Sequence, residues 1–89
     1  MPYSVIWTSK AAHEYAKLDN TVRQQIDKYL TKLSFSDDPR NMGKALTADL
    51  AGLWRYRVGD YRIVAQVNDA ELIILILSVK HRSIVYRQK

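Results

Sequence analysis

Hydrophobic and polar residues alternate with a period of two over residues 53–67, and Gly59-Asp60 interrupts the alternation near its middle. Glycine tolerates the positive φ that a tight two-residue turn requires at its first position, so the pattern predicts a β-hairpin that closes at this pair. Side chains alternate between the two faces of a strand. The hairpin then has an apolar face formed by Trp54, Tyr56, Val58, Tyr61, Ile63, Ala65 and Val67.

The other face of this hairpin carries Arg55, Arg57 and Arg62. The predicted pairing places Arg57 directly opposite Arg62, and like charges in that position cost on the order of a few tenths to ~1 kcal/mol of stability. Planar guanidinium groups bind phosphate oxygens in pairs, so concentrated repulsion of this kind indicates a phosphate-binding site without its anion. The alternative is a solvated strand face on which the arginines lie flat over their neighbours.

The rest of the chain predicts two helices between a first strand and the hairpin. Residues 2–7 alternate as a short strand, and Thr8 or Ser9 caps a helix from about Lys10 to Leu18. The capping-box pattern Thr21-x-x-Gln24 opens a second, longer helix. Residues 36–52 are predicted to be irregular, and their length makes them a candidate functional loop.

Residues 72–79 are apolar at every position except Ser78, which predicts a strand buried on both faces inside a sheet. The element order is therefore strand, helix, helix, strand, strand, strand. This order predicts one α+β domain over residues 1–89, with a small, mostly antiparallel four-stranded sheet and the helical hairpin packed on one face.

The net charge of +5 is unevenly distributed along the chain. Residues 1–52 hold seven basic and six acidic residues, whereas residues 53–89 hold seven basic and three acidic residues. A basic face in the strand-rich half favours binding to nucleic acid through its phosphates. The chain has no cysteine, no cluster with metal-ligand spacing, no signal-peptide pattern and no apolar run of the roughly twenty residues that span a bilayer. We therefore expect a cytoplasmic protein without disulfide, metal, cofactor or membrane contact.

Arginine does not act as a base near neutral pH, so any proton transfer needs other groups. His81 and Tyr86, in the basic C-terminal segment, are the candidates. With no metal ligands in the pattern, the hypothesis that follows is RNA cleavage with the substrate's own 2′-OH as nucleophile. DNA lacks that hydroxyl and could not react in this way. The alternatives are that His81 caps a strand and Tyr86 anchors the terminal turn. Lys44 could reach a phosphate, although an exposed loop lysine is more often only solvated.

The run from Leu53 to Val64, followed by the run from Ser78 to Tyr86, resembles the RelE family of bacterial and archaeal toxins. The strand–helix–helix order and the chain length also fit that family. The resemblance implies the toxin of a type II toxin–antitoxin pair, which enters the A site of the 30S ribosomal subunit. There it would cut mRNA without a metal, by attack of the 2′-OH on the adjacent phosphate.

The resemblance also implies roles for individual residues. Arg55 and Arg57 match two basic positions of the first hairpin strand that are often lysines in the family, and Arg62 matches a phosphate-binding arginine. Tyr86 matches a tyrosine proposed as the general base. The remaining basic position, which assists the leaving group, falls within Lys80-His81-Arg82, with His81 and Arg82 both possible. Further RNA contacts are expected from Lys44, Lys80 and Arg87.

The partners implied are a RelB-like antitoxin, the ribosome and mRNA. A second hypothesis is a toxin of the ParE type, which shares the fold and poisons DNA gyrase by protein–protein contact. A third is an inactive binding module of the same fold. The joint presence of the three arginines and Tyr86 favours the nuclease.

Overall fold

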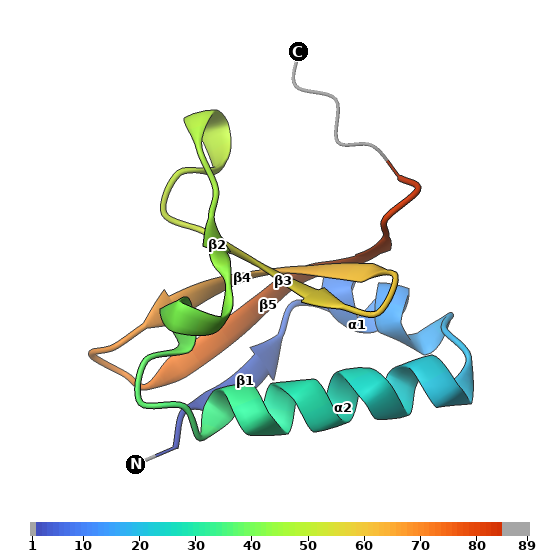
Figure 1. The fold of residues 1–89 in the computed structure, drawn as a ribbon, viewed down its shortest axis with the longest axis horizontal. Helices are drawn as coiled ribbons and strands as arrows, with labels where there is room; N and C mark the ends of the chain where they lie inside the picture. The colour runs from blue at the N-terminus through green and yellow to red at the C-terminus, as the bar shows by residue number, and fades with distance from the viewer. Residues whose placement is uncertain (1, 85–89) are drawn as a thin grey trace.

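The computed structural model describes residues 2–84 and shows a five-stranded sheet with two helices on one face (Figure 1). In chain order the elements are β1 (Ser4–Trp7), α1 (Ser9–Ala16), α2 (Asn20–Ser34), the 3-10 helix η1 (Pro39–Met42), β2 (Lys44–Ala45), the 3-10 helix η2 (Ala48–Leu50), β3 (Trp54–Val58), β4 (Tyr61–Asn68) and β5 (Ile73–His81). The strands lie in the order β1-β5-β4-β3-β2. Only the β1–β5 pair is parallel, so the predicted α+β class with a mostly antiparallel sheet is confirmed.

The prediction of four strands was wrong, because the segment expected to be irregular contributes a fifth. In β2, Lys44 pairs with Arg55 and Ala45 pairs with Trp54. A strand of two residues is too short to show an alternating pattern, so the sequence carries no signal for it. Beginning with β2 the chain runs out from the body, forms η2 and returns to β3; we call this projecting segment, residues 44–53, the arm (Figure 1).

The first helix is capped as predicted, and the second is not. The Thr8 hydroxyl accepts a hydrogen bond from the Ala11 amide at 3.1 Å, which satisfies one of the free N–H groups at the start of α1. The capping box predicted at Thr21 is wrong: α2 starts at Asn20, and Asp19 stands at the N-cap without a side-chain cap bond. Because the helix begins earlier, Thr21 lies inside its first turn rather than at the cap.

The central hairpin has the predicted register. Gly59 has φ +56°, as the turn requires, and Arg57 pairs with Arg62. The apolar face of this hairpin packs with both helices into one core, whose fully buried large side chains are Tyr56, Ile26, Leu33, Ile63, Ile74, Ile76 and Pro39. Strand β5 lies between β1 and β4, as its continuous apolar run predicted. No helix within residues 2–84 is long and apolar enough to cross a membrane.

Candidate nucleic-acid interface

Three basic residues from three adjacent strands form one row across the sheet. Arg57 on β3 pairs with Arg62 on β4, and Arg62 pairs with Lys80 on β5. Tyr56 and Val58, which flank Arg57, are buried in the core beneath the helices, so the alternation of the strand turns Arg57 to the opposite face. We call Arg57, Arg62 and Lys80 the hairpin row. It lies on the sheet face that the helices leave open.

A second pair of basic residues lies beside this row on the same face. Lys44 on β2 pairs with Arg55 on β3, two positions before Arg57, which corresponds to about 7 Å along the strand. None of the ion pairs formed within residues 2–84 includes Lys44, Arg55, Arg57 or Arg62. The described part of the chain therefore offers four cations on one face without a carboxylate to neutralise them.

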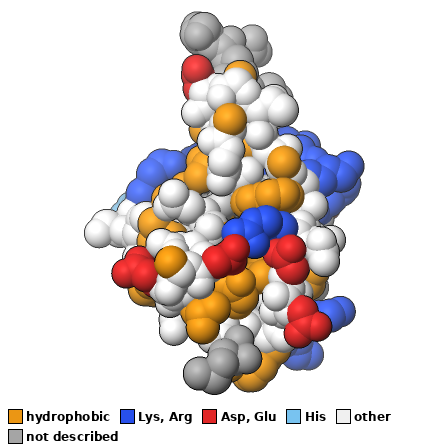
Figure 2. All heavy atoms as spheres, turned by 90° about the vertical axis from the view of Figure 1, so that its left-hand side faces the viewer, with side chains coloured by type: hydrophobic (Ala, Val, Ile, Leu, Met, Phe, Trp, Pro, Cys, Tyr) orange, Lys and Arg blue, Asp and Glu red, His pale blue; other side chains and the backbone are white. Residues whose placement is uncertain are grey.

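The base of the arm and β3 enclose a hollow of about 230 Å³ beside these cations. Its lining consists of Asn41, Met42, Gly43, Lys44, Arg55 and Arg57. Figure 2 views this end of the molecule, where the arm rises above the body and Lys and Arg side chains gather on both flanks of its base. We call this space the arm hollow.

Lys80, the outermost member of the hairpin row, is bound to a carboxylate. Strand β1 pairs with β5 only as far as Ile76. Beyond that point Glu14 of α1 covers the open edge, accepting the Val79 amide at 2.9 Å and the Lys80 ammonium at 2.5 Å. Burial alone would raise the pKa of the Glu14 carboxyl, but these hydrogen bonds outweigh it and hold the pKa below its usual value. Lys80 is therefore fixed at the sheet edge by Glu14, a residue that sequence reasoning missed.

His81 lies on the other face of the sheet from the arginines. It pairs with Tyr61, and their rings meet edge to face with centroids 5.2 Å apart. The Ser83 amide donates to His81 Nδ1 at 3.1 Å, and the Ser83 hydroxyl lies 2.8 Å from the same atom. Because a backbone amide only donates, Nδ1 accepts, and the neutral ring carries its proton on Nε2. The sequence did not indicate this separation of His81 from Arg62.

Arg82 is tied to the hairpin turn. Its amide donates to the Asp60 carbonyl oxygen at 2.7 Å, and its Nε lies 3.5 Å from Asp60 Oδ1. Asp60 therefore does more than form the turn, because it also fixes the end of β5 beside the hairpin. Tyr86 and Arg87, the predicted base and one predicted RNA contact, lie outside the described residues.

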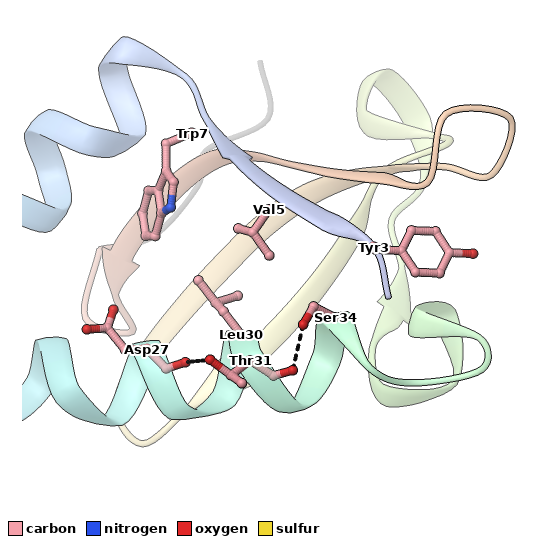
Figure 3. Close-up of a pocket in the computed structure, with 7 residues that line it drawn as sticks. All are labelled: Tyr3, Val5, Trp7, Asp27, Leu30, Thr31 and Ser34. Carbon is pink, nitrogen blue, oxygen red and sulfur yellow. Dashed lines mark hydrogen bonds between the residues drawn. The ribbon is translucent and has the colours of Figure 1, made fainter. Parts of the chain in front are cut away.

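A second hollow, of about 290 Å³, lies on the helical side between β1 and α2 (Figure 3). Its lining consists of Tyr3, Val5, Trp7, Asp27, Leu30, Thr31 and Ser34. Asp27 is the single carboxylate of this lining, and it accepts the Tyr15 hydroxyl at 2.7 Å. Within residues 2–84 no three side chains are grouped as a metal site. No Lys or Arg lines this hollow, so it does not offer the cations of a phosphate-binding site.

The open face has the chemistry of a phosphate-binding surface. Arg57 and Arg62 each carry a guanidinium cation, which presents a planar set of donors. Two such groups on adjacent strands can hold the non-bridging oxygens of one phosphodiester and stabilise charge that develops on them. Neither of them can move a proton, so a reaction on this face needs an acid and a base from elsewhere.

Known proteins support this assignment of the fold. Residues 5–86 match a family model described as the ParE toxin of type II toxin–antitoxin systems. The chain is 32% identical to the toxin RelG of Mycobacterium tuberculosis, with 99% of this chain and 100% of that protein covered. It is 32% identical to the mRNA interferase toxin RelE of Escherichia coli, with 99% of this chain and 94% of that protein covered.

A solved structure shows the same architecture. The crystal structure of the toxin–antitoxin complex RelBE2 from M. tuberculosis contains a chain that superposes with a TM-score of 0.83 at 31% identity, covering 93% of this chain and 94% of that one. The agreement therefore extends over most of the chain, and not only over the hairpin motif. On these grounds the chain belongs to the RelE/ParE superfamily and is a toxin of the RelE family of type II toxin–antitoxin systems.

Proposed function

We propose that this toxin is a ribosome-dependent endoribonuclease that cuts mRNA in the A site. In this proposal the 2′-OH of the substrate attacks the adjacent phosphate, which Arg57 and Arg62 hold and whose growing negative charge they stabilise. Arg55, two positions before Arg57 on the same face of β3, assists in stabilising this charge. The observation that supports the proposal is the pairing of Arg57 with Arg62 on an open face, without a carboxylate partner among the described residues.

The proton-transfer groups come from the C-terminal segment in this proposal. Tyr86 is the base, by its resemblance to the tyrosine of the family. Between the two candidates for the leaving group, the structure favours Arg82 over His81, because the His81 ring packs on Tyr61 on the other face. Arg82 follows the last residue of β5, where the chain leaves the sheet beside the hairpin turn. An acid–base set this sparse is consistent with a ribosome that supplies further groups.

The comparisons also support an antitoxin partner. The similar M. tuberculosis chain is part of a toxin–antitoxin complex, and we propose that a RelB-like antitoxin silences this toxin in the same manner. A helical segment of that antitoxin would cover the open sheet face or displace the C-terminal element. Either arrangement would prevent mRNA from binding to the arginines.

The alternative function is inhibition of DNA gyrase, because the matching family model carries the ParE description. The E. coli relative is named an mRNA interferase, and the basic face of this chain offers a phosphate site that contact with gyrase would not require. We therefore favour the nuclease, and the experiment below distinguishes the two.

The test is a cell-free translation reaction in which the toxin is added and the 5′ ends of the mRNA are mapped. We expect cuts within A-site codons, and we expect Arg62→Ala and Tyr86→Phe to abolish them. Lys28→Ala removes a charge from the exposed side of α2 and serves as the control that keeps full activity. Intact mRNA together with inhibited DNA supercoiling would overturn the nuclease proposal in favour of the gyrase alternative.

A further inference from the structure

All the charged residues that line the arm hollow are cations. Three of its six lining residues are Lys44, Arg55 and Arg57, and no carboxylate lines it. None of these three forms an ion pair within residues 2–84. Three like charges around one open space repel one another, so an anion placed there relieves the repulsion and gains charge-assisted hydrogen bonds.

The wall of this hollow is held rigidly on the core by two tyrosines. The buried Tyr56 hydroxyl donates to the Pro39 carbonyl oxygen at 2.9 Å, and the Tyr29 hydroxyl donates to the Met42 carbonyl oxygen at 3.2 Å. Both carbonyls belong to η1, the segment that leads into the arm. The hollow is therefore preorganised, because its wall does not have to become ordered when a ligand enters.

Gly43 brings the backbone of this wall against the sheet. A Cβ at this position would lie 2.7 Å from Tyr56 Cε1 and 2.9 Å from the Arg55 carbonyl oxygen, closer than real Cβ atoms approach such groups. Only glycine therefore allows β2 to pair with β3 at this distance. The close approach places Lys44 directly opposite Arg55 and closes the hollow on one side.

The arm hollow and the hairpin row are adjacent but offset along β3. Arg57 belongs to both. Arg55 lies two residues before it on β3, a separation of about 7 Å, and Lys44 lies opposite Arg55 on β2. Consecutive phosphates of one extended RNA strand are separated by a comparable distance. We propose that the arm hollow binds the phosphodiester next to the one that is cut, on the same mRNA strand. This inference rests on the proposed function, since it takes the hairpin row as the site of the cut phosphate.

The experiment measures binding of short RNAs whose 2′ oxygens are methylated, so that they cannot be cut. One probe is a dinucleoside monophosphate, with a single phosphodiester, and the other is a trinucleoside diphosphate, with two. We expect the wild-type toxin to bind the second probe about tenfold more tightly, the size of one charge-assisted hydrogen bond. We expect Lys44→Ala to lose most of this gain.

Lys28→Ala is the matched control, because it removes the same charge from an exposed helical position and should retain the tenfold gain. Urea unfolding of both variants verifies that each is folded. Equal affinity of the wild type for the two probes, or an equal gain in the two variants, would overturn the subsite. A third result would also overturn the subsite: Lys44→Ala binds ribosomes more weakly than the wild type, while its affinities for the two RNA probes do not differ from those of the wild type. The hollow would then contact ribosomal RNA. The assay measures binding and not cleavage. Its failure is therefore distinct from failure of the nuclease proposal, which intact mRNA in the cell-free translation reaction would show.

Discussion

The pairing of Arg57 with Arg62 predicts that replacing either arginine makes the toxin more stable. The two residues are direct cross-strand neighbours with no carboxylate between them among the described residues. In a two-residue hairpin the pair next to the turn is hydrogen-bonded, so the following pair, Arg57–Arg62, is of the non-hydrogen-bonded kind. The Cα atoms of such a pair are about 4.5 Å apart, the closer of the two spacings in an antiparallel sheet.

The magnitude follows from this geometry and from exposure to solvent. Like charges directly opposite each other on a sheet face cost roughly 0.2–1 kcal/mol, and Arg57 is exposed, so water keeps the repulsion within that range. Replacing either arginine with glutamine should therefore raise the free energy of unfolding by a few tenths to ~1 kcal/mol. For a domain of this size, 1 kcal/mol corresponds to about 4–8 °C in Tm.

A double-mutant cycle in urea isolates this repulsion from other effects of the substitutions. Arg57→Gln and Arg62→Gln should each stabilise the protein, while the double variant should gain less than the sum, because the repulsion is lost only once. Lys28→Gln controls for the change in net charge and should not stabilise to the same extent. The coupling should shrink in 1 M salt, where the Debye length is about 3 Å. A coupling of zero at low salt, or an attractive one, would refute the reasoning.

Three further predictions concern the residues that support this face. Tyr56→Phe should cost about 1–3 kcal/mol in urea unfolding, because the buried Pro39 carbonyl loses its hydrogen bond, and an unchanged midpoint would contradict this. Burial raises the pKa of Tyr56 to about 12, so an ultraviolet titration should show at least one phenol that stays neutral well above pH 10, and titration of every tyrosine near pH 10 would be the opposing result. Because this pKa is raised in the folded state, the stability that the neutral phenol contributes should be lost only as the pH rises above about 10. Because the pKa of Glu14 is lowered in the folded state, its charge stabilises the protein above about pH 4.5, and this contribution is lost on acidification. Glu14→Gln should therefore lower the free energy of unfolding by less below that pH than above it, and a loss that does not depend on pH would contradict this.

The hairpin could be predicted from sequence because its signals are local. The alternation over residues 53–67 and the glycine at position 59 together determine the turn, the register and the face of each arginine. Strand β5 was also predictable, since a strand apolar on both faces has to lie inside a sheet. These features need no information from distant parts of the chain.

What the sequence did not reveal depends on contacts between distant residues. The alternation of β5 is hidden because both of its faces are apolar, and its register against β4 shifts at Val64/Ala65, so the face of His81 could not be assigned. Strand β2 forms because Gly43 allows a close approach to Tyr56, which no periodicity in the sequence shows. Glu14 meets Lys80 only because β1 ends before β5 does and α1 packs on the remaining edge.

The most direct test of the proposed chemistry is a single-turnover cleavage measurement on ribosomes programmed with two mRNAs. One carries ribonucleotides throughout, and the other carries a single 2′-deoxynucleotide on the 5′ side of the A-site phosphate that is cut. If the 2′-OH attacks a phosphate held by Arg57 and Arg62, the toxin will cut the first mRNA and leave the second intact at that position, and Arg62→Ala will cut the first about 100- to 1000-fold more slowly. Cleavage of the deoxy-substituted mRNA at a similar rate, or an unchanged rate for Arg62→Ala, would contradict the account.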